Sequence, residues 1–253
     1  MMAMIFIGVD LGWTSQPTGL CCLRSHYIAD RLELQLVELT RIDSLESVLA
    51  WIDRQCPATQ MGGIAVDAPT LIRNETGMRM CDRFAHRYFG RYHAGCYPAN
   101  LGLPFAQRTV GFGLALEQRG FCHAPSLQPQ QPTRFQVEVF PHPATIRLFR
   151  LPRILKYKKG RVSDRHIALS QFRQHILDSL PSANPSLSIT EDDLPTIPKT
   201  GVAMKAVEDQ LDSLICAYVA AHWWAWGQER NQILGDGETG YIVVPNPDRL
   251  LLD

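Results

Sequence analysis

The segment AMKAVEDQLDSLICAYVAAHWW, residues 203–224, begins with charged residues and becomes apolar on nearly every side. At roughly 100° per residue, both faces of such a helix are mostly apolar past its first turns, which is typical of a helix packed on two sides. Asp209 and Asp212 are three residues apart and therefore share one surface. We expect a buried helix with two carboxylates at its edge, where a negative charge needs a cation, a hydrogen-bond donor or a proton.

Five apolar segments predict the strands of a sheet that would receive this helix. Two of them stop at a carboxylate, which is Asp10 in the first and Asp67 in the fourth. The first three segments follow one another closely, and the third alternates apolar and polar residues with period two, which favours an antiparallel meander. The predicted strands are residues 5–10, 18–25, 32–40, 62–69 and 135–143.

Three further segments predict helices, at residues 44–54, 79–89 and 165–180. The first of them has Ser44 as its expected N-cap. Between the fourth and fifth strands, residues 70–134 are rich in Gly, Pro, Arg and His, and we expect this insertion to shape a site above the sheet. The order of elements predicts an α/β fold in which residues 1–253 form a single domain.

Bulk composition restricts the function classes. The chain has 253 residues, 45% hydrophobic content and equal numbers of basic and acidic residues, so no global charge attracts it to nucleic acid or to an anionic membrane. No apolar run approaches the roughly 20 residues of a transmembrane helix, and the N-terminus lacks a basic region with a cleavage site. We therefore expect a cytoplasmic protein with no membrane partner, whose seven irregularly spaced cysteines are reduced thiols.

Four carboxylates stand in positions where reactive groups of sheet proteins are commonly held. Asp10 and Asp67 end strands, and Asp209 and Asp212 share a helix surface. Such a set suits two divalent cations about 4 Å apart, as in-line phosphoryl chemistry requires. Each acid also has a structural explanation, because aspartates begin turns and acidic residues in a first helical turn are favoured by the helix dipole.

Six sequence blocks resemble the successive motifs of an uncharacterised DUF family described as predicted RNase H-like nucleases. The last block, in which DxxD precedes a small residue and an alanine-rich stretch, also resembles the final catalytic motif of RuvC-type Holliday-junction resolvases. The resemblance implies an RNase H-like mixed sheet of five strands, the first three antiparallel, flanked by helices, with an insertion between strands 4 and 5. The blocks are GVDLGW (8–13), AVDAPT (65–70), GMRMCDR (77–83), VEVFPHPA (137–144), YKKG (157–160) and EDQLDSLICAYVA (208–220).

The resemblance also implies roles for the acids. Asp10 matches the first-strand aspartate that bridges both metal ions in RNase H-like nucleases, and Asp67 matches the acid that ends the fourth strand. Asp209 and Asp212 match the acidic pair of the final helix, so the four would be catalytic ligands of two Mg²⁺ or Mn²⁺ ions. Glu138 is a fifth ligand, a neighbour of the ligands, or a strand glutamate facing solvent. The resolvases carry a glutamate where this chain has Asp67, and a shorter side chain changes the metal spacing.

Basic and aromatic residues supply candidates for substrate binding. Arg79 and Arg83 lie on a predicted helix, where they would contact a substrate phosphate or the acidic cluster, or form a salt-bridged surface. Tyr157, Lys158 and Lys159 belong to a basic stretch that would grip phosphates and stack on a base, or remain a solvated loop.

Several histidines are further candidates. His142, which lies between two prolines after the last strand, is close enough to the acids to exchange protons, although loop histidines are more often inert. A zinc site formed by Cys81, His86, His93 and Cys96 matches no common ligand spacing.

Three function classes follow from these residues. The preferred one is a metal-dependent nuclease that hydrolyses phosphodiester bonds in DNA, RNA, a branched junction or a small nucleotide. The second is a non-catalytic binding or scaffold protein that keeps the RNase H fold. The third is an actin-like small-molecule kinase or ATPase, because GVDLGWTSQPTG (8–19) is similar to the first phosphate loop of those enzymes. They need a duplicated core larger than this chain and a Gly-rich adenosine motif, which the sequence lacks.

Overall fold

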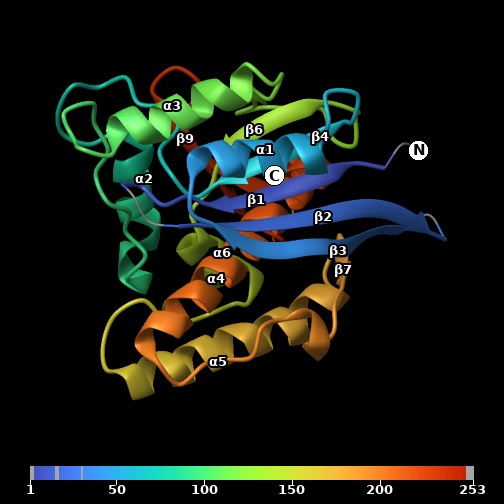
Figure 1. The fold of residues 1–253 in the computed structure, drawn as a ribbon. Coiled ribbons are helices and arrows are strands. Elements are labelled where there is room, and N and C mark those ends of the chain that lie inside the picture. Colours follow the sequence, from blue (N-terminus) through green and yellow to red (C-terminus); the bar gives the residue numbers. More distant parts are fainter. Residues whose placement is uncertain (1–2, 15–16, 30, 249–253) are drawn as a thin grey trace.

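A mixed sheet of seven strands, in the order β5-β6-β4-β1-β2-β3-β7, forms the centre of the computed structural model, which describes residues 3–14, 17–29 and 31–248 (Figure 1). The β1–β2 and β2–β3 pairs are antiparallel, as the sequence predicts, and the four remaining pairs are parallel. The strands are β1 (Ile5–Asp10), β2 (Thr18–Ile28), β3 (Arg31–Ile42), β4 (Gly62–Val66), β5 (Cys122–His123), β6 (Arg134–Glu138) and β7 (Ser186–Ser188).

The expected number of five strands is wrong, because β5 and β7 extend the two edges of the sheet. These strands have two and three residues, too few to show a period of two in the sequence. The last predicted strand, residues 135–143, is also shorter than expected. It ends at Glu138, and Pro141 starts the helix α4 (Pro141–Leu148), a position that suits proline because its missing N–H is not needed there.

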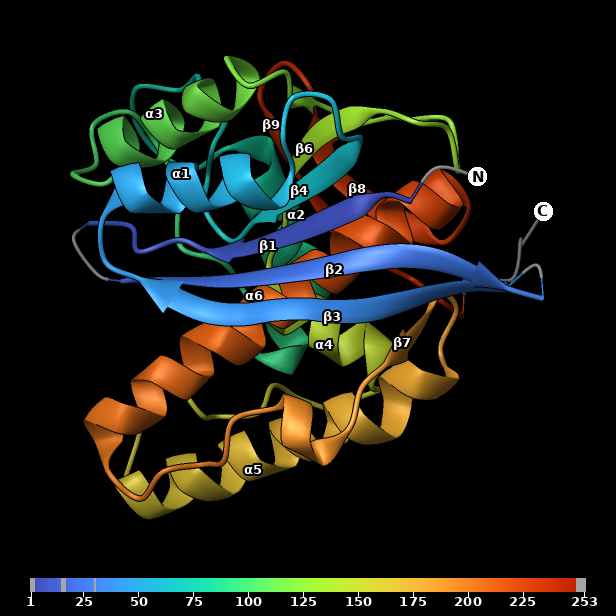
Figure 2. The ribbon, with the colours of Figure 1, turned by 45° about the vertical axis from the view of Figure 1, so that its right-hand side comes forward.

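Alternating side chains of β1 and β2 pack into two hydrophobic layers, one on each face of the sheet. Ile5, Ile7 and Val9 pack with α1 (Leu45–Gln55) and α3 (Ala106–Glu117) on one face. Met4 and Phe6 point into the core on the other face, where α4, α5 (Val162–Ser179) and α6 (Gly201–Trp226) lie. Figures 1 and 2 show the two sets of helices on opposite sides of the sheet.

The backbone of α6 rests directly on the sheet, and two glycines make this approach possible. A Cβ atom on Gly8 would lie 1.8 Å from the carbonyl oxygen of Ser213. A Cβ atom on Gly19 would lie 2.0 Å from the carbonyl oxygen of Asp209. Since Gly19 is the cross-strand partner of Asp10, the contact brings the turn of α6 that carries Asp209 over the end of β1.

Residues 70–134, the predicted insertion, lie between β4 and β6 and contain α2 (Met80–Phe89), η1 (Gly90–Tyr92), α3 and β5. The sequence predicts α2 but not α3, because Gly111 and Gly113 lower the helix propensity of that segment. The chain ends in a hairpin that was also not predicted, β8 (Asn231–Asp236) and β9 (Gly240–Pro245). Three short 3₁₀ helices complete the secondary structure of the described residues: η2 (Leu180–Ser182), η3 (Glu191–Asp193) and η4 (Gly227–Glu229).

None of the helices in the described part of the chain combines the length and the apolar character that a bilayer crossing requires.

Candidate functional site

A cleft of about 630 Å³ opens at the carboxyl ends of β1, β4 and β6. Clefts outside the carboxyl ends of parallel strands are the usual ligand sites of α/β sheets, and this volume lies within the roughly 300–1,000 Å³ of small-molecule sites. The acids Asp10, Asp67, Glu138 and Asp209 line it, and so do the cations Lys156, Lys158, Lys159 and Lys205.

Asp10 and Asp67 are neighbours because of strand register. β1 and β4 are parallel with Val9 opposite Val66, so the next residue of each strand carries its carboxylate to the same edge. The Asp67 backbone N–H donates to the Val9 carbonyl at 2.8 Å, and a hydrogen bond joins the two carboxyl groups. The predicted convergence of these two acids is therefore present in the structure.

The two carboxyl groups are protonated more easily than isolated aspartates. Burial raises the pKa of Asp67 to about 6, although Lys158 opposes the rise. Burial also raises the pKa of Asp10 well above its ordinary value, again against Lys158, and the charges of Asp212, Asp67 and Asp209 raise it further. The charge of Asp212 raises the pKa of both groups, and the pair at the strand ends shares a proton in the absence of an added cation.

Asp209 and Asp212, by contrast, each have a cation of their own. One Asp209 oxygen accepts from Arg41 Nε at 2.9 Å, and the other lies 2.7 Å from Lys205 Nζ. Asp212 accepts a hydrogen bond from the Tyr157 hydroxyl at 2.7 Å and lies 2.8 Å from Lys158 Nζ.

Lys158 is the cation common to Asp10, Asp67 and Asp212. Burial alone would lower its pKa, but the charges of Asp212, Tyr157, Asp10 and Asp67 raise it well above the ordinary value, so the ammonium group stays charged. About a third of its side chain is exposed, at 31%, and it lines the cleft beside Asp10 and Asp67. An anionic ligand in the cleft would therefore meet a fixed positive charge.

The carboxylates suit one divalent ion better than two. Carboxylate oxygens are the donors that Mg²⁺ and Mn²⁺ prefer, and Mg²⁺ is commonly held by one or two carboxylates with waters and substrate phosphates. Asp10 and Asp67 offer such a pair, crowded enough to share a proton. Within residues 3–14, 17–29 and 31–248, no group of three or more His, Cys, Asp or Glu side chains is arranged to hold a metal ion. A second ion at Asp209 and Asp212 would have to displace Lys158 and Lys205.

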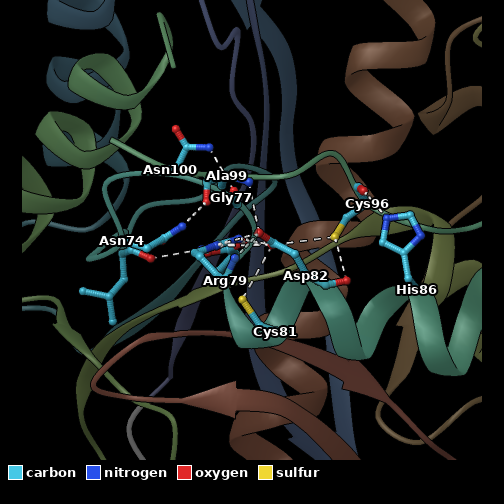
Figure 3. A network of polar contacts seen from close by, with 11 residues as sticks. Asn74, Gly77, Arg79, Cys81, Asp82, His86, Cys96, Ala99 and Asn100 are labelled. Carbon is cyan, nitrogen blue, oxygen red and sulfur yellow. Dashed lines mark hydrogen bonds and ion pairs between the residues drawn. The ribbon is translucent and has the colours of Figure 1, made fainter. Parts of the chain in front are cut away.

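Glu138 and Arg79 form a buried ion pair, which corrects the prediction of Glu138 as a metal ligand and of Arg79 as a phosphate-binding residue. Arg79 donates to the two Glu138 oxygens at 2.6 and 2.7 Å and to Asp82 at 2.8 Å. Figure 3 shows Arg79 and Asp82 at the centre of a network that also includes Cys81, Cys96 and the backbone of Ala99. Because each acid is already bound to Arg79, Glu138 is not a free metal ligand and Arg79 is not a free phosphate-binding group.

The other predicted substrate-binding residues fall into two groups. Lys159 is exposed and lines the cleft with Lys158. Arg83 is exposed on α2 and is not among the residues lining the cleft. Tyr157 is buried, with its ring stacked on Phe172 at a centroid distance of 4.9 Å. Its predicted stacking on a substrate base is wrong, because no face of the ring is free and its hydroxyl holds Asp212.

His142 lines the cleft, as expected from its place after the last strand. Burial, followed by the charge of Lys158, lowers the pKa of His142 to about 4, so near neutral pH the ring is uncharged and is a weak proton acceptor. The imagined zinc ligands are engaged elsewhere: the Cys81 and Cys96 thiols contact Asp82, and His86 Nε2 lies 2.8 Å from the Cys96 carbonyl oxygen.

Two cations of the site, Arg41 and Lys205, were not predicted. Lys205 precedes Asp209 by four residues, and this helical spacing was the available signal. Arg41 lies on β3 opposite Gly19, which in turn lies opposite Asp10, so three neighbouring strands bring it to the site. Only the pairing register, which composition does not reveal, could have identified it.

A family model described as "Protein of unknown function (DUF429)" matches residues 8–239 of the chain, a range that includes the four aspartates, Lys158 and Lys205. No curated protein and no solved structure matches the chain.

Proposed function

The chain belongs to the DUF429 family of proteins of unknown function, and we propose that it is a metal-dependent hydrolase of phosphodiester bonds with an RNase H-like core. The observation that carries the proposal is the convergence of Asp10 and Asp67 at the ends of adjacent parallel strands, beneath the acidic turn of α6. The antiparallel β1–β2 and β2–β3 pairs within a mixed sheet support the fold assignment, since the resemblance to RNase H-like proteins implies a mixed sheet whose first three strands are antiparallel.

Asp10 and Asp67 are the residues that would hold a divalent ion, Mg²⁺ or Mn²⁺. When bound, such an ion supplies Lewis-acid activation of the phosphodiester. The charge of the ion would also remove the need for a shared proton, because it replaces the repulsion between two ionised carboxylates with attraction. The proposed site thus explains why two acids are kept close together although their proximity lowers the folding stability of the metal-free protein.

Lys158 and Lys205 supply the positive charge that a second ion would otherwise bring. Both ammonium groups line the cleft, and each is fixed by an aspartate of α6 at 2.8 or 2.7 Å. Preorganised cations of this kind bind a phosphate and stabilise the negative charge that grows on its oxygens during cleavage. We therefore propose one ion and two lysines in place of the two ions expected from the sequence, with Asp209 and Asp212 as the groups that position the lysines.

The experiment is a cleavage panel with and without Mg²⁺ or Mn²⁺. End-labelled single-stranded DNA, single-stranded RNA, a four-way junction and a dinucleotide cover the substrate classes. Cleavage of at least one substrate should require the metal ion and fall by about 100-fold or more in Asp10→Asn, because the ion whose positive charge stabilises the transition state loses one of its carboxylate ligands. Asp192→Asn, on an exposed residue of η3, is the matched control and should cleave like the wild type. Absence of cleavage of every substrate, or equal cleavage by Asp10→Asn, would refute the proposal.

A non-catalytic binding protein is the second candidate, and the ion pairs of Asp209 and Asp212 favour it, since they neutralise two of the predicted metal ligands. In that case the same oligonucleotides would bind without being cleaved. The kinase-like alternative predicts stabilisation of the fold by ATP, measured as a rise in Tm, with no cleavage of nucleic acid.

A further inference from the structure

An aromatic cluster borders the cleft next to Asp67. Trp13 and Phe105 have ring centroids 4.6 Å apart, and Tyr97 meets Phe105 edge to face at 6.3 Å. Phe105 is buried, whereas Tyr97 is 66% exposed, the largest exposure of any aromatic side chain in the described residues. Trp13 and Tyr97 both line the cleft.

Trp13 is fixed to the same element ends that carry the acids. It follows Asp10 by three residues, and its indole Nε1–H donates to the backbone carbonyl of Asp67 at 3.0 Å. The turn that carries it is also held, because Arg108 Nε donates to the Gly12 carbonyl at 2.7 Å. The position of the Trp13 ring is therefore fixed relative to the carboxyl groups of Asp10 and Asp67. A ligand bound at these acids lies beside the aromatic surface.

The cleft thus has two chemically different parts. One part is aromatic, formed by Trp13 and Tyr97, and the other carries the ammonium groups of Lys158 and Lys205 with the carboxylates. An exposed aromatic ring at the edge of a charged cleft offers a face on which a flat ligand ring can stack. A ligand that satisfies both parts must combine a flat, weakly polar ring with an anionic group, and a nucleotide has this composition.

We propose that Trp13 and Tyr97 stack on the nucleobase next to the phosphate bound at Lys158 and Lys205, so that the substrate is a nucleotide or an unpaired single strand. This inference rests on the proposed function, because it concerns the same cleft. Stacking on a protein ring requires a base with a free face, which a base inside a duplex does not offer. Tyr157, the aromatic residue that the sequence suggests for this role, is buried, so the stacking surface comes from the other side of the cleft.

The test measures binding in EDTA, where no cleavage occurs, by fluorescence anisotropy of two labelled probes. One probe is a short oligothymidylate and the other is an abasic oligonucleotide of the same length. Stacking contributes about 1–3 kcal/mol per base, and about 1.4 kcal/mol corresponds to a tenfold change, so Tyr97→Ala should weaken oligothymidylate binding by about 5- to 150-fold. Binding of the abasic probe should not change, and Tyr97→Phe should bind both probes like the wild type.

Tyr88→Ala is the matched control, since Tyr88 is also an exposed tyrosine, at 42%, but lies on α2 and does not line the cleft. It should leave the Kd of both probes unchanged. Equal Kd values of the wild type for the two probes, or equal weakening of both by Tyr97→Ala, would overturn the inference. Adding Mg²⁺ separates the two proposals. Base-dependent binding without cleavage contradicts only the hydrolase, whereas cleavage of both probes at rates independent of Tyr97 contradicts only the stacking.

Discussion

Replacing Asp67 with asparagine should stabilise the metal-free protein, although Asp67 belongs to the proposed site. Burial raises the pKa of its carboxyl group from an ordinary 3.8 to about 6. The native state therefore holds a proton that the unfolded state releases, and the wild type loses stability as pH rises from about 4 to above 6. Asparagine carries no ionisable group, so Asp67→Asn avoids this loss and can still donate a hydrogen bond to Asp10.

The magnitude follows from the two pKa values. At about 1.4 kcal/mol for each tenfold change, a rise from 3.8 to about 6 corresponds to about 3 kcal/mol for the ionised carboxylate above pH 7. Asp67 lies at the cleft, where its partial exposure lets solvent screen the charge, so we expect a gain of about 1–2 kcal/mol. As the pH falls toward 3.8 and below, the carboxyl group becomes protonated in both states, and the gain should shrink toward zero.

The assay is urea unfolding in EDTA at pH 4 and pH 8, for the wild type, Asp67→Asn and Asp192→Asn. The free energy of unfolding at pH 8 should be higher for Asp67→Asn alone, because Asp192 is exposed and is not among the residues that line the cleft. Saturating Mn²⁺ should reverse the order, since only the wild type then gains binding energy. An Asp67→Asn variant that is less stable than the wild type at pH 8 in EDTA would refute the reasoning about crowded carboxylates.

Two other substitutions test the packing that builds the site. Arg79→Met should lower the free energy of unfolding by about 3–5 kcal/mol, measured by urea denaturation, because Glu138 and Asp82 are left buried without their cation; a loss below about 1 kcal/mol would show that the ion pair is unimportant. Gly19→Ala should prevent α6 from docking on the sheet, since the added Cβ would lie 2.0 Å from the Asp209 carbonyl oxygen; circular dichroism should show a lower Tm, and an unchanged Tm would contradict the described contact.

The sequence was sufficient to find the acids because local patterns mark them. Asp10 and Asp67 end apolar runs, and strand ends are where a parallel sheet presents its side chains at one edge. Asp209 and Asp212 were marked by helical spacing within a segment that is apolar on both faces. The antiparallel order of β1, β2 and β3 was also predictable, because short connections join consecutive strands.

The residues that pair with the buried acids could not be predicted from local sequence patterns. Arg79 looked like a surface arginine on an amphipathic helix, and only the tertiary fold places it within 2.7 Å of Glu138, 59 residues away. Tyr157 stands in a basic stretch whose composition indicates a solvated loop, yet its ring is buried against α5. Ion pairs between distant segments depend on register and docking, which a hydrophobic pattern does not determine.

The most direct test of the account is the number of Mn²⁺ ions bound per chain, measured by isothermal titration calorimetry near pH 7.5. We predict one saturable site in the wild type, lost in Asp10→Asn and in Asp67→Asn and retained in Asp192→Asn. Absence of saturable binding, or binding that survives both cleft substitutions, would contradict the claim that Asp10 and Asp67 form the metal site. Two ions bound to the wild type would contradict the assignment of Lys158 and Lys205 as the second positive charge.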